Sequence, residues 1–79
     1  MELLYKAEAV KQLKKLPQSE KKKIARKLEL LAQNPLSGKS LRGELEGLRS
    51  LRVWPYRIIY ETERRSITIL FVIHRQSAY

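Results

Sequence analysis

Two short segments with alternating apolar and polar side chains, separated by a Trp-Pro pair, constrain the fold more than any other part of the sequence. The apolar positions are Leu51, Val53, Tyr56, Ile58 and Tyr60, and the positions between them include Ser50, Arg52, Arg57 and Ile59. A period of two places successive side chains on opposite faces of a strand. Pro55 lacks a backbone donor and disfavours helix at Trp54. Residues 48–60 are therefore predicted to form two strands joined by a tight turn, with one apolar face and one face that carries arginines.

Apolar side chains at three- and four-residue spacing predict two helices before this hairpin. The first covers residues 7–16, and Pro17 ends it. Its apolar stripe consists of Val10, Leu13 and Leu16. The second runs to about Gln33, before Asn34-Pro35, and its stripe consists of Ile24, Ala25, Leu28, Leu31 and Ala32. The short link between them predicts an antiparallel helical hairpin.

Two further strands complete the predicted fold. Residues 2–5 are typical of a short edge strand, and residues 66–73 have apolar side chains on both faces, which predicts a central strand covered on both sides. Residues 36–47 contain three glycines and few apolar side chains, which predicts a loop. The chain is therefore expected to be a single α+β domain over residues 1–79, in which the helical hairpin packs on one face of a mainly antiparallel sheet of about four strands.

Composition limits the possible functions. The 79 residues include no Cys and one His, so disulfides, thiolate metal sites and a histidine cluster are excluded, and we expect neither a metal nor a cofactor. No apolar run approaches the roughly 20 residues that a membrane span needs. The N-terminus also lacks the charged, apolar and small-residue order of a signal peptide. We therefore expect a soluble, cytoplasmic protein with no membrane partner.

The charge of the chain favours an anionic partner. Seventeen Lys and Arg against eight Asp and Glu give a net charge of +9. For so small a domain this is consistent with nucleic acid or an acidic protein, and less with a membrane surface, because the apolar residues are needed for the core. Lys22, Lys23 and Arg26 on the second predicted helix are candidate contacts to ribosomal RNA, with a purely solvated helix face as the alternative.

Several short motifs occur in a characteristic order. They are Leu16-Pro17-Gln18-Ser19-Glu20, Asn34-Pro35, Leu41-Arg42-Gly43, Leu51-Arg52-Val53, Tyr56-Arg57-Ile58-Ile59-Tyr60 and His74-Arg75-Gln76-Ser77-Ala78-Tyr79. None is specific alone, but together they cover essentially the whole chain. In order and spacing the chain resembles the RelE/ParE toxin family of bacterial and archaeal type II toxin–antitoxin modules.

The resemblance implies a compact toxin that a cognate antitoxin holds inactive. In this family the RelE branch enters the ribosomal A site and cuts mRNA without a metal, whereas the ParE branch poisons DNA gyrase. We expect a ribonuclease whose partners are the ribosome, mRNA and an antitoxin. A gyrase poison and a basic RNA- or DNA-binding module without toxicity are the alternatives.

By position, the resemblance makes Arg52, Arg57, His74, Arg75 and Tyr79 the candidate catalytic residues. Cleavage through the 2′-OH requires cations at the phosphate and groups that carry protons, and an imidazole with a pKa near 6.5 suits the second task. A gyrase poison has no need of such a group beside clustered arginines. Ser50 departs from the family, because ribonuclease members have a second basic residue there. Candidate RNA-binding residues that could compensate are Lys39, Arg42 and Arg49.

Each of these residues also has a structural explanation. Arg52 and Arg57 could solvate an open sheet face or contact an antitoxin. A single histidine such as His74 is more often a structural residue at a strand end than a catalyst. Trp54 could be a platform on which a base stacks, although packing in the core or against a partner is the commoner fate of a lone tryptophan.

Overall fold

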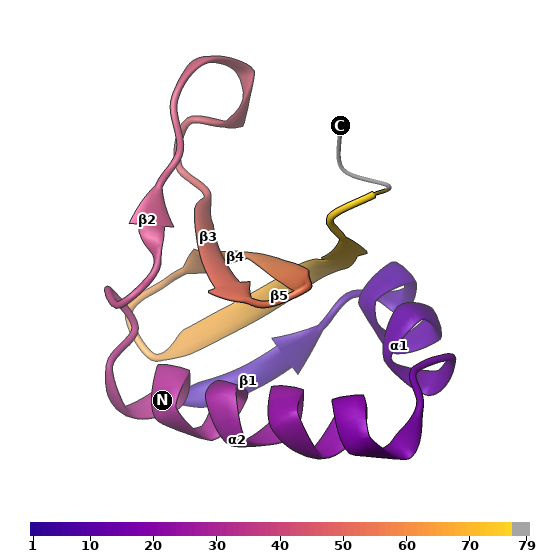
Figure 1. Ribbon diagram of the computed structural model, residues 1–79. Helices are drawn as coiled ribbons and strands as arrows, with labels where there is room; N and C mark the ends of the chain where they lie inside the picture. The colour runs from indigo at the N-terminus through magenta and orange to yellow at the C-terminus, as the bar shows by residue number, and fades with distance from the viewer. Residues whose placement is uncertain (77–79) are drawn as a thin grey trace.

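The computed structural model describes residues 1–76, which form two helices and one five-stranded sheet (Figure 1). In chain order the elements are β1 (Glu2–Tyr5), α1 (Ala7–Lys14), α2 (Gln18–Gln33), β2 (Lys39–Ser40), the 3-10 turn η1 (Gly43–Leu45), β3 (Arg49–Val53), β4 (Tyr56–Thr62) and β5 (Ser66–His74). The strand order is β1-β5-β4-β3-β2, in which β1 is parallel to β5 and the other pairs are antiparallel. This confirms the predicted α+β class, with β1 at an edge and β5 inside the sheet.

The sheet has five strands where about four were predicted, because the expected loop 36–47 contains β2. Lys39 pairs with Ser50 and Ser40 with Arg49. Both residues of β2 are exposed, so they show no apolar alternation that could reveal a strand. Their extended conformation depends on pairing with β3, and the intrinsic strand propensity of Lys and Ser does not predict this pairing.

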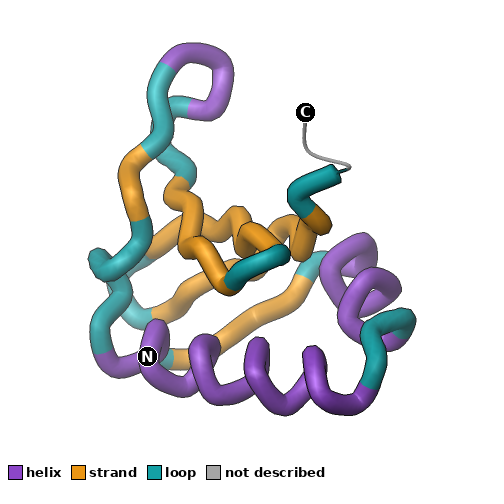
Figure 2. Tube along the Cα trace, viewed as in Figure 1, coloured by secondary structure: helices purple, strands orange, loops and turns teal. Residues whose placement is uncertain are grey.

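Both helices lie on one side of the sheet (Figure 2). The apolar stripe of α2 is buried against the sheet at Ile24, Leu28 and Leu31, as predicted, whereas Ala25 of the predicted stripe is exposed. The sheet contributes Val53, Ile58, Tyr60, Ile67, Ile69 and Val72 to the same core. None of the helices in residues 1–76 is long and apolar enough to cross a membrane.

Hydrogen bonds of two side chains, Gln12 and Tyr60, fix the outer parts of the fold to this core. Gln12 Oε1 on α1 accepts a hydrogen bond from the backbone N–H of Val72 at 2.7 Å. Val72 lies beyond Ile69, the last residue of β5 that pairs with β1. The hydroxyl of Tyr60 donates to the carbonyl of Pro35 and accepts the N–H of Gly38, both at 2.9 Å. The segment that leads from α2 into β2 is therefore anchored from beneath by Tyr60.

The opposite face of the sheet is only partly as predicted. Val53 and Ile58 are buried under the helices, and Arg52 and Arg57 point the other way, as the alternation indicates. However, β5 is not covered on both sides, because Phe71 is 42% exposed on the face without helices. This face therefore combines arginines with apolar side chains.

Candidate functional site

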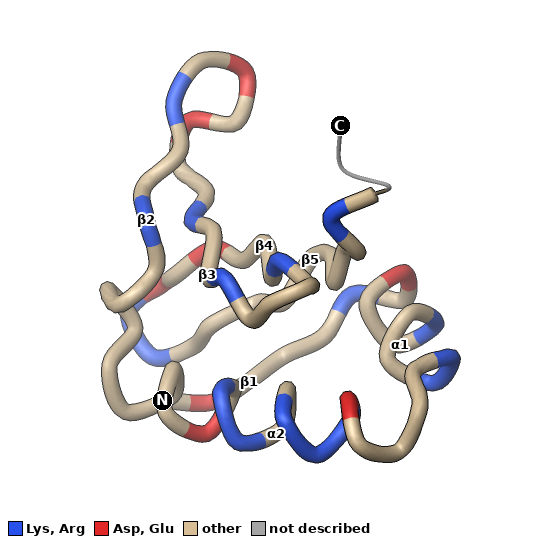
Figure 3. Tube along the Cα trace, in the orientation of Figure 1, with Lys and Arg blue, Asp and Glu red and all other residues tan. Residues whose placement is uncertain are grey.

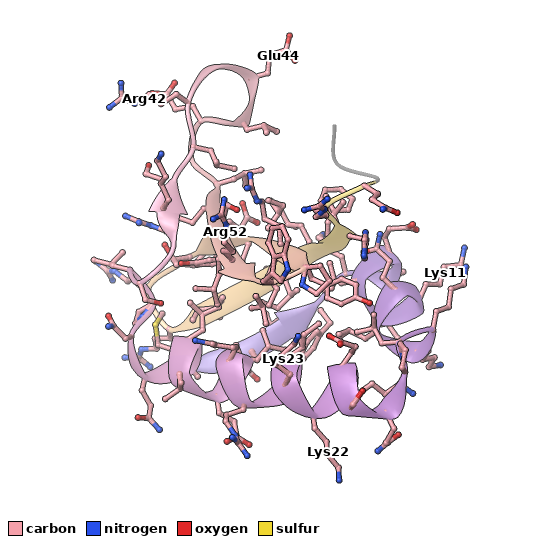
Figure 4. All side chains as sticks on the ribbon, viewed as in Figure 1. Lys11, Lys22, Lys23, Arg42, Glu44 and Arg52 are labelled. Atoms are coloured by element: carbon pink, nitrogen blue, oxygen red, sulfur yellow. The ribbon has the colours of Figure 1, made fainter. Side chains whose placement is uncertain are left out.

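Strand register brings the first two candidate arginines together. Arg52 on β3 and Arg57 on β4 are direct partners across the antiparallel pair, so their side chains leave the same face. Figure 4 shows Arg52 standing out from β3, and the helices lie on the other side of the sheet (Figure 1). Arg52 is exposed, whereas Arg57 is half-buried and participates in further interactions of its own. Two like charges thus occupy adjacent positions on one open face.

Arg75 reaches the same region from the end of β5. Its backbone N–H donates to the carbonyl of Pro55 at 2.8 Å, which ties the segment after β5 to the turn between β3 and β4. Its guanidinium lies over the ring of Trp54, with Cζ 4.7 Å from the ring centroid. At an exposed site such a cation–π contact contributes about 0.5–1 kcal/mol. The turn therefore positions Arg75 through both its backbone and its side chain.

These residues surround one recess, which we call the arginine pocket. Its lining consists of Arg52, Trp54, Arg57, Arg75 and Gln76, and its volume is about 490 Å³. No Asp or Glu belongs to the part of the lining formed by residues 1–76, which carries three arginines. Planar guanidinium groups bind phosphate oxygens in pairs, and an exposed indole offers a stacking surface to a base. The arginine pocket is therefore suited to the backbone of a nucleic acid.

His74 does not line this pocket. Its strand neighbour Ile73 pairs with Arg57, so alternation directs His74 to the opposite face, where it pairs with Tyr56. The two rings meet edge to face, with centroids 5.2 Å apart and planes at 88°. His74 Nδ1 accepts the backbone N–H of Gln76 at 3.2 Å, which leaves Nε2 as the protonated nitrogen of a neutral ring.

The other predicted residues near the hairpin separate into two groups. Lys39 is exposed and pairs with Ser50, which places it on the sheet face that carries Arg52 and Arg57, here called the arginine face. Arg42 is exposed on the loop that carries η1 (Figure 4). Arg49 instead pairs with Tyr60 on the helix side, and its Nη1 donates to the carbonyl of Gly38 at 2.7 Å. Alternation with Leu51 could have indicated this. Tyr79 lies outside the described residues.

The basic residues of α2 form a separate surface. Figure 3 shows their positions on the helix layer, beneath the sheet and away from the arginine face. Lys22 and Arg26 are exposed. Lys23 donates from Nζ to the carbonyl of Trp54 at 2.7 Å and forms an ion pair with Glu20 at 2.9 Å. Lys23 therefore supports the turn on which the arginine pocket is built.

Comparison with known proteins identifies the family. Residues 3–79 match the family described as "ParE toxin of type II toxin-antitoxin system, parDE". The chain belongs to this toxin family. A search of curated proteins gave no match. The match over nearly the whole chain confirms the resemblance inferred from the motifs.

Solved structures of RelE and YoeB proteins share the fold of this toxin. It is similar to the toxin–antitoxin complex RelBE2 from Mycobacterium tuberculosis, at 32% identity over 94% of this chain and 96% of that one, with a TM-score of 0.86. A RelB–RelE complex from Methanococcus jannaschii is 30% identical over 96% and 94% of the two chains, with a TM-score of 0.76. The isolated RelE toxin of E. coli, 19% identical over 92% and 82%, has a TM-score of 0.80 and supports the fold alone.

The toxin has a second large recess on its helix side, which we call the helix groove. It lies between β1, α1 and α2, has a volume of about 540 Å³, and is lined by Leu3, Tyr5, Val10, Leu13, Lys14, Lys21, Ile24, Ala25, Leu28 and Glu29. Most of these side chains are apolar. The sequence pattern identified the stripes that form it as core, and only the packing shows that part of them borders an open groove.

Two further features of the toxin site were not found from the sequence. Gln76 lines the arginine pocket beside Arg75, and Phe71 lies exposed on the same sheet face. The alternation in β5 could have indicated the position of Phe71, because Phe71 lies on the same face of the strand as Ile73 and on the opposite face from the buried Val72. Gln76 carries no such pattern. In residues 1–76, no group of three or more His, Cys, Asp or Glu side chains is arranged to hold a metal.

Proposed function

We propose that this toxin is a metal-independent endoribonuclease that cuts mRNA on the ribosome and thereby inhibits translation. The observation that carries the proposal is the convergence of Arg52, Arg57 and Arg75 with the exposed indole of Trp54 in one pocket. A phosphodiester with a base on either side is the ligand that matches both kinds of group. The proposal assigns the pocket to the scissile phosphate.

The chemistry follows from what the pocket provides. The ribose 2′-oxygen attacks the adjacent phosphorus while its proton is removed, the bond to the 5′-oxygen breaks, and that oxygen receives a proton. The products are a 2′,3′-cyclic phosphate and a free 5′-hydroxyl. Negative charge increases on the phosphoryl oxygens at the transition state, so guanidinium groups placed there in advance lower the barrier. We assign this role to Arg57 and Arg75, with Arg52 orienting the phosphate.

Proton transfer is assigned to His74, and Tyr79 is assigned the stacking or orientation of a base. His74 lies next to Arg75 in the chain but on the Tyr56 side of the sheet. The proposal therefore requires the end of β5 at His74 to change conformation when RNA binds, so that the imidazole comes within hydrogen-bonding reach of the reacting oxygens. The hydrogen bond from Gln76 N–H to Nδ1 is the contact that would break.

The remaining basic residues are assigned to binding. Lys39 and Arg42 lie on or beside the arginine face and would contact RNA flanking the cut. Lys22, Lys23 and Arg26 would contact ribosomal RNA from the helix layer. Arg49 donates a hydrogen bond to the carbonyl of Gly38. We therefore assign it an indirect role in RNA binding, in which it positions the segment that leads into β2. These contacts are electrostatic and should weaken as salt concentration rises.

We further propose that a cognate antitoxin binds the toxin. The similar structures from M. tuberculosis and M. jannaschii are toxin–antitoxin complexes. The helix groove offers an apolar surface for an amphipathic helix, and the net charge of +9 favours a partner with acidic residues. Co-expression with the neighbouring open reading frame should relieve toxicity and yield a complex, and failure of both would contradict this assignment.

The decisive experiment compares two activities of the purified toxin. In one reaction it is added to ribosomes stalled on a defined mRNA, and the RNA ends are mapped. In the other it is added to DNA gyrase with supercoiled plasmid, and cleaved DNA is measured. We expect mRNA cuts at the ribosomal A site and no gyrase-linked breaks. Intact mRNA together with gyrase-linked breaks would show that the arginine pocket serves gyrase poisoning instead.

A further inference from the structure

A second recess adjoins the arginine pocket on the same sheet face. We call it the apolar recess. Its apolar lining consists of Leu41, Leu45, Leu48, Ile59, Phe71 and Ile73, and its volume is about 240 Å³. Arg57 lines both the apolar recess and the arginine pocket. A group that contacts Arg57 can therefore extend into either one.

The register of three strands builds the floor of the apolar recess. Ser50, Ile59 and Phe71 are partners across β3, β4 and β5, and the next row pairs Arg57 with Ile73. Because directly opposed residues share a face, these side chains form a continuous surface in which apolar groups adjoin a guanidinium. Ser50 is buried at this floor.

The loop around η1 supplies the other wall. The N–H of Leu41 donates to the carbonyl of Leu48, and the N–H of Leu48 donates to the carbonyl of Leu45, each at 3.0 Å. Gly43 and Gly47 have positive φ angles of 71° and 93°, which lets the chain reverse twice within this short loop. In Figure 1 the loop rises from the sheet on the side away from the helices. The wall is thus an internally hydrogen-bonded loop.

Exposure and size restrict what this surface can hold. Phe71 is 42% and Leu45 is 50% exposed, so apolar surface is left in contact with water beside a cluster of cations. A volume of about 240 Å³ is below the roughly 300–1,000 Å³ of sites for drug-sized ligands. It suits a single flat ring system better than the face of a helix, for which the helix groove is larger and more apolar.

We propose that the apolar recess binds one nucleobase of the RNA whose phosphate contacts Arg57. This inference rests on the proposed function, and it adds a specificity site beside the reacting phosphate. In a nucleotide the base and the phosphate are covalently joined, so a phosphate at Arg57 carries its base toward Phe71. Charge complementarity favours this occupant, because Arg52 and Arg57 attract the backbone while the aromatic and aliphatic side chains take the base.

The lining also sets the kind of selectivity. Within residues 1–76, only Ser50 and Arg57 contribute polar side chains to the recess. Discrimination among bases is therefore by stacking area rather than by a pattern of hydrogen bonds, and purines should bind better than pyrimidines. Phe71 and Leu45 are the positions that determine this preference.

The test measures binding without cleavage. A short single-stranded RNA with 2′-O-methyl riboses lacks the attacking hydroxyl, and a matched set carries one abasic nucleotide at each position in turn. Stacking on an aromatic ring contributes about 1–3 kcal/mol per base, so Phe71→Ala should weaken binding of the intact RNA by about tenfold. Leu45→Ala removes apolar contact without a ring and should weaken binding by less. RNA that is abasic at one particular position should bind the wild type about tenfold more weakly than intact RNA does. Phe71→Ala should bind that abasic RNA and the intact RNA with the same affinity. Leu30→Ala, which changes an exposed apolar residue on α2, is the control.

The outcomes separate this inference from the proposed function. Weaker binding by Arg57→Ala, with no effect of Phe71→Ala or of any abasic position, would overturn the base site and leave the phosphate site intact. Additive losses from Phe71→Ala and the abasic position would also overturn it. Loss of antitoxin binding with unchanged RNA binding in Phe71→Ala would identify a protein-docking surface. A wild type that does not bind the isolated RNA would overturn the base site, whereas the proposed function is tested separately by cleavage of mRNA on the ribosome.

Discussion

The guanidinium of Arg75 lies on the ring of Trp54, 4.7 Å from its centroid, and the backbone N–H of Arg75 is bonded to Pro55 in the same turn. The turn between β3 and β4 thus determines where a residue from the end of β5 is placed. Lys23 supports the turn from below through the carbonyl of Trp54. Trp54 is 57% exposed, so it can hold Arg75 and still present surface to RNA.

Trp54→Ala should lower RNA cleavage by about tenfold or more. The substitution removes a cation–π contact of about 0.5–1 kcal/mol and a stacking surface of about 1–3 kcal/mol. Trp54→Phe keeps a ring and should show an intermediate rate. The rate of cleavage of ribosome-bound mRNA and the melting temperature should be measured for both. Wild-type cleavage in Trp54→Ala would show that the ring neither positions Arg75 nor contacts substrate.

Arg57→Ala and Arg75→Ala should each lower the cleavage rate by about 10²-fold or more, because loss of one donor that acts on the transition state costs about that much. Cells should tolerate expression of both variants. Arg64→Ala and Arg65→Ala are the matched controls, since each removes one charge from the exposed turn between β4 and β5. Equal loss in the controls would mean that only overall charge matters.

Leu28→Asp should unfold the domain, whereas Leu30→Asp should not. Leu28 is 4% exposed in the core, and Leu30, two positions along the same helix, is 53% exposed. The first change loses a buried side chain and buries an unpaired carboxylate, at a cost of several kcal/mol. Circular dichroism during thermal unfolding measures the difference. Equal melting temperatures for the two variants would show that the buried stripe of α2 is misassigned.

Tyr60→Phe should destabilise the toxin by about 1–3 kcal/mol, because the buried N–H of Gly38 loses its acceptor. Burial raises the pKa of the Tyr60 phenol, against smaller lowering effects of the Gly38 hydrogen bond and the charge of Arg49. Folding therefore favours the neutral phenol, and its contribution is complete below the unfolded pKa of about 10 and is lost as pH rises through the folded pKa. The free-energy difference between wild type and variant should stay constant to about pH 9 and decrease above it.

Urea unfolding at a series of pH values gives this difference directly. Tyr5→Phe, which changes a side chain that is 41% exposed, should alter stability at pH 7 by less than about 0.5 kcal/mol. A difference between wild type and Tyr60→Phe that grows above pH 10 would contradict the direction of the shift.

Treatment of the toxin with EDTA, followed by desalting, should leave cleavage unchanged. Within residues 1–76 no cluster of His, Cys, Asp and Glu has the arrangement of a metal site, and the chain has no Cys. The chelator must be removed before ribosomes are added, since they require Mg²⁺ themselves. Restoration of a lost activity by one added divalent metal would refute the metal-independent mechanism.

The sequence by itself determined the faces of the hairpin strands and the buried side of α2, but not that Phe71 lies exposed. The alternation around Arg52 and Arg57 placed both arginines opposite the apolar face, and the spacing of Ile24, Leu28 and Leu31 identified the buried side of α2. These patterns are local, because each depends only on the two-residue or 3.6-residue period of one element and on the exclusion of apolar groups from water. They were sufficient to predict the α+β class.

Only the tertiary structure decided which residues meet. The pairing of Arg57 with Ile73 turns His74 toward Tyr56, and the pairing of Lys39 with Ser50 creates β2. The contact between Arg75 and Trp54 depends on how the end of β5 meets a turn that precedes it by about 20 residues. The period of one strand sets the face on which a residue lies, but it does not specify which residue of a distant segment becomes its partner. That choice depends on how the segments pack against a common core.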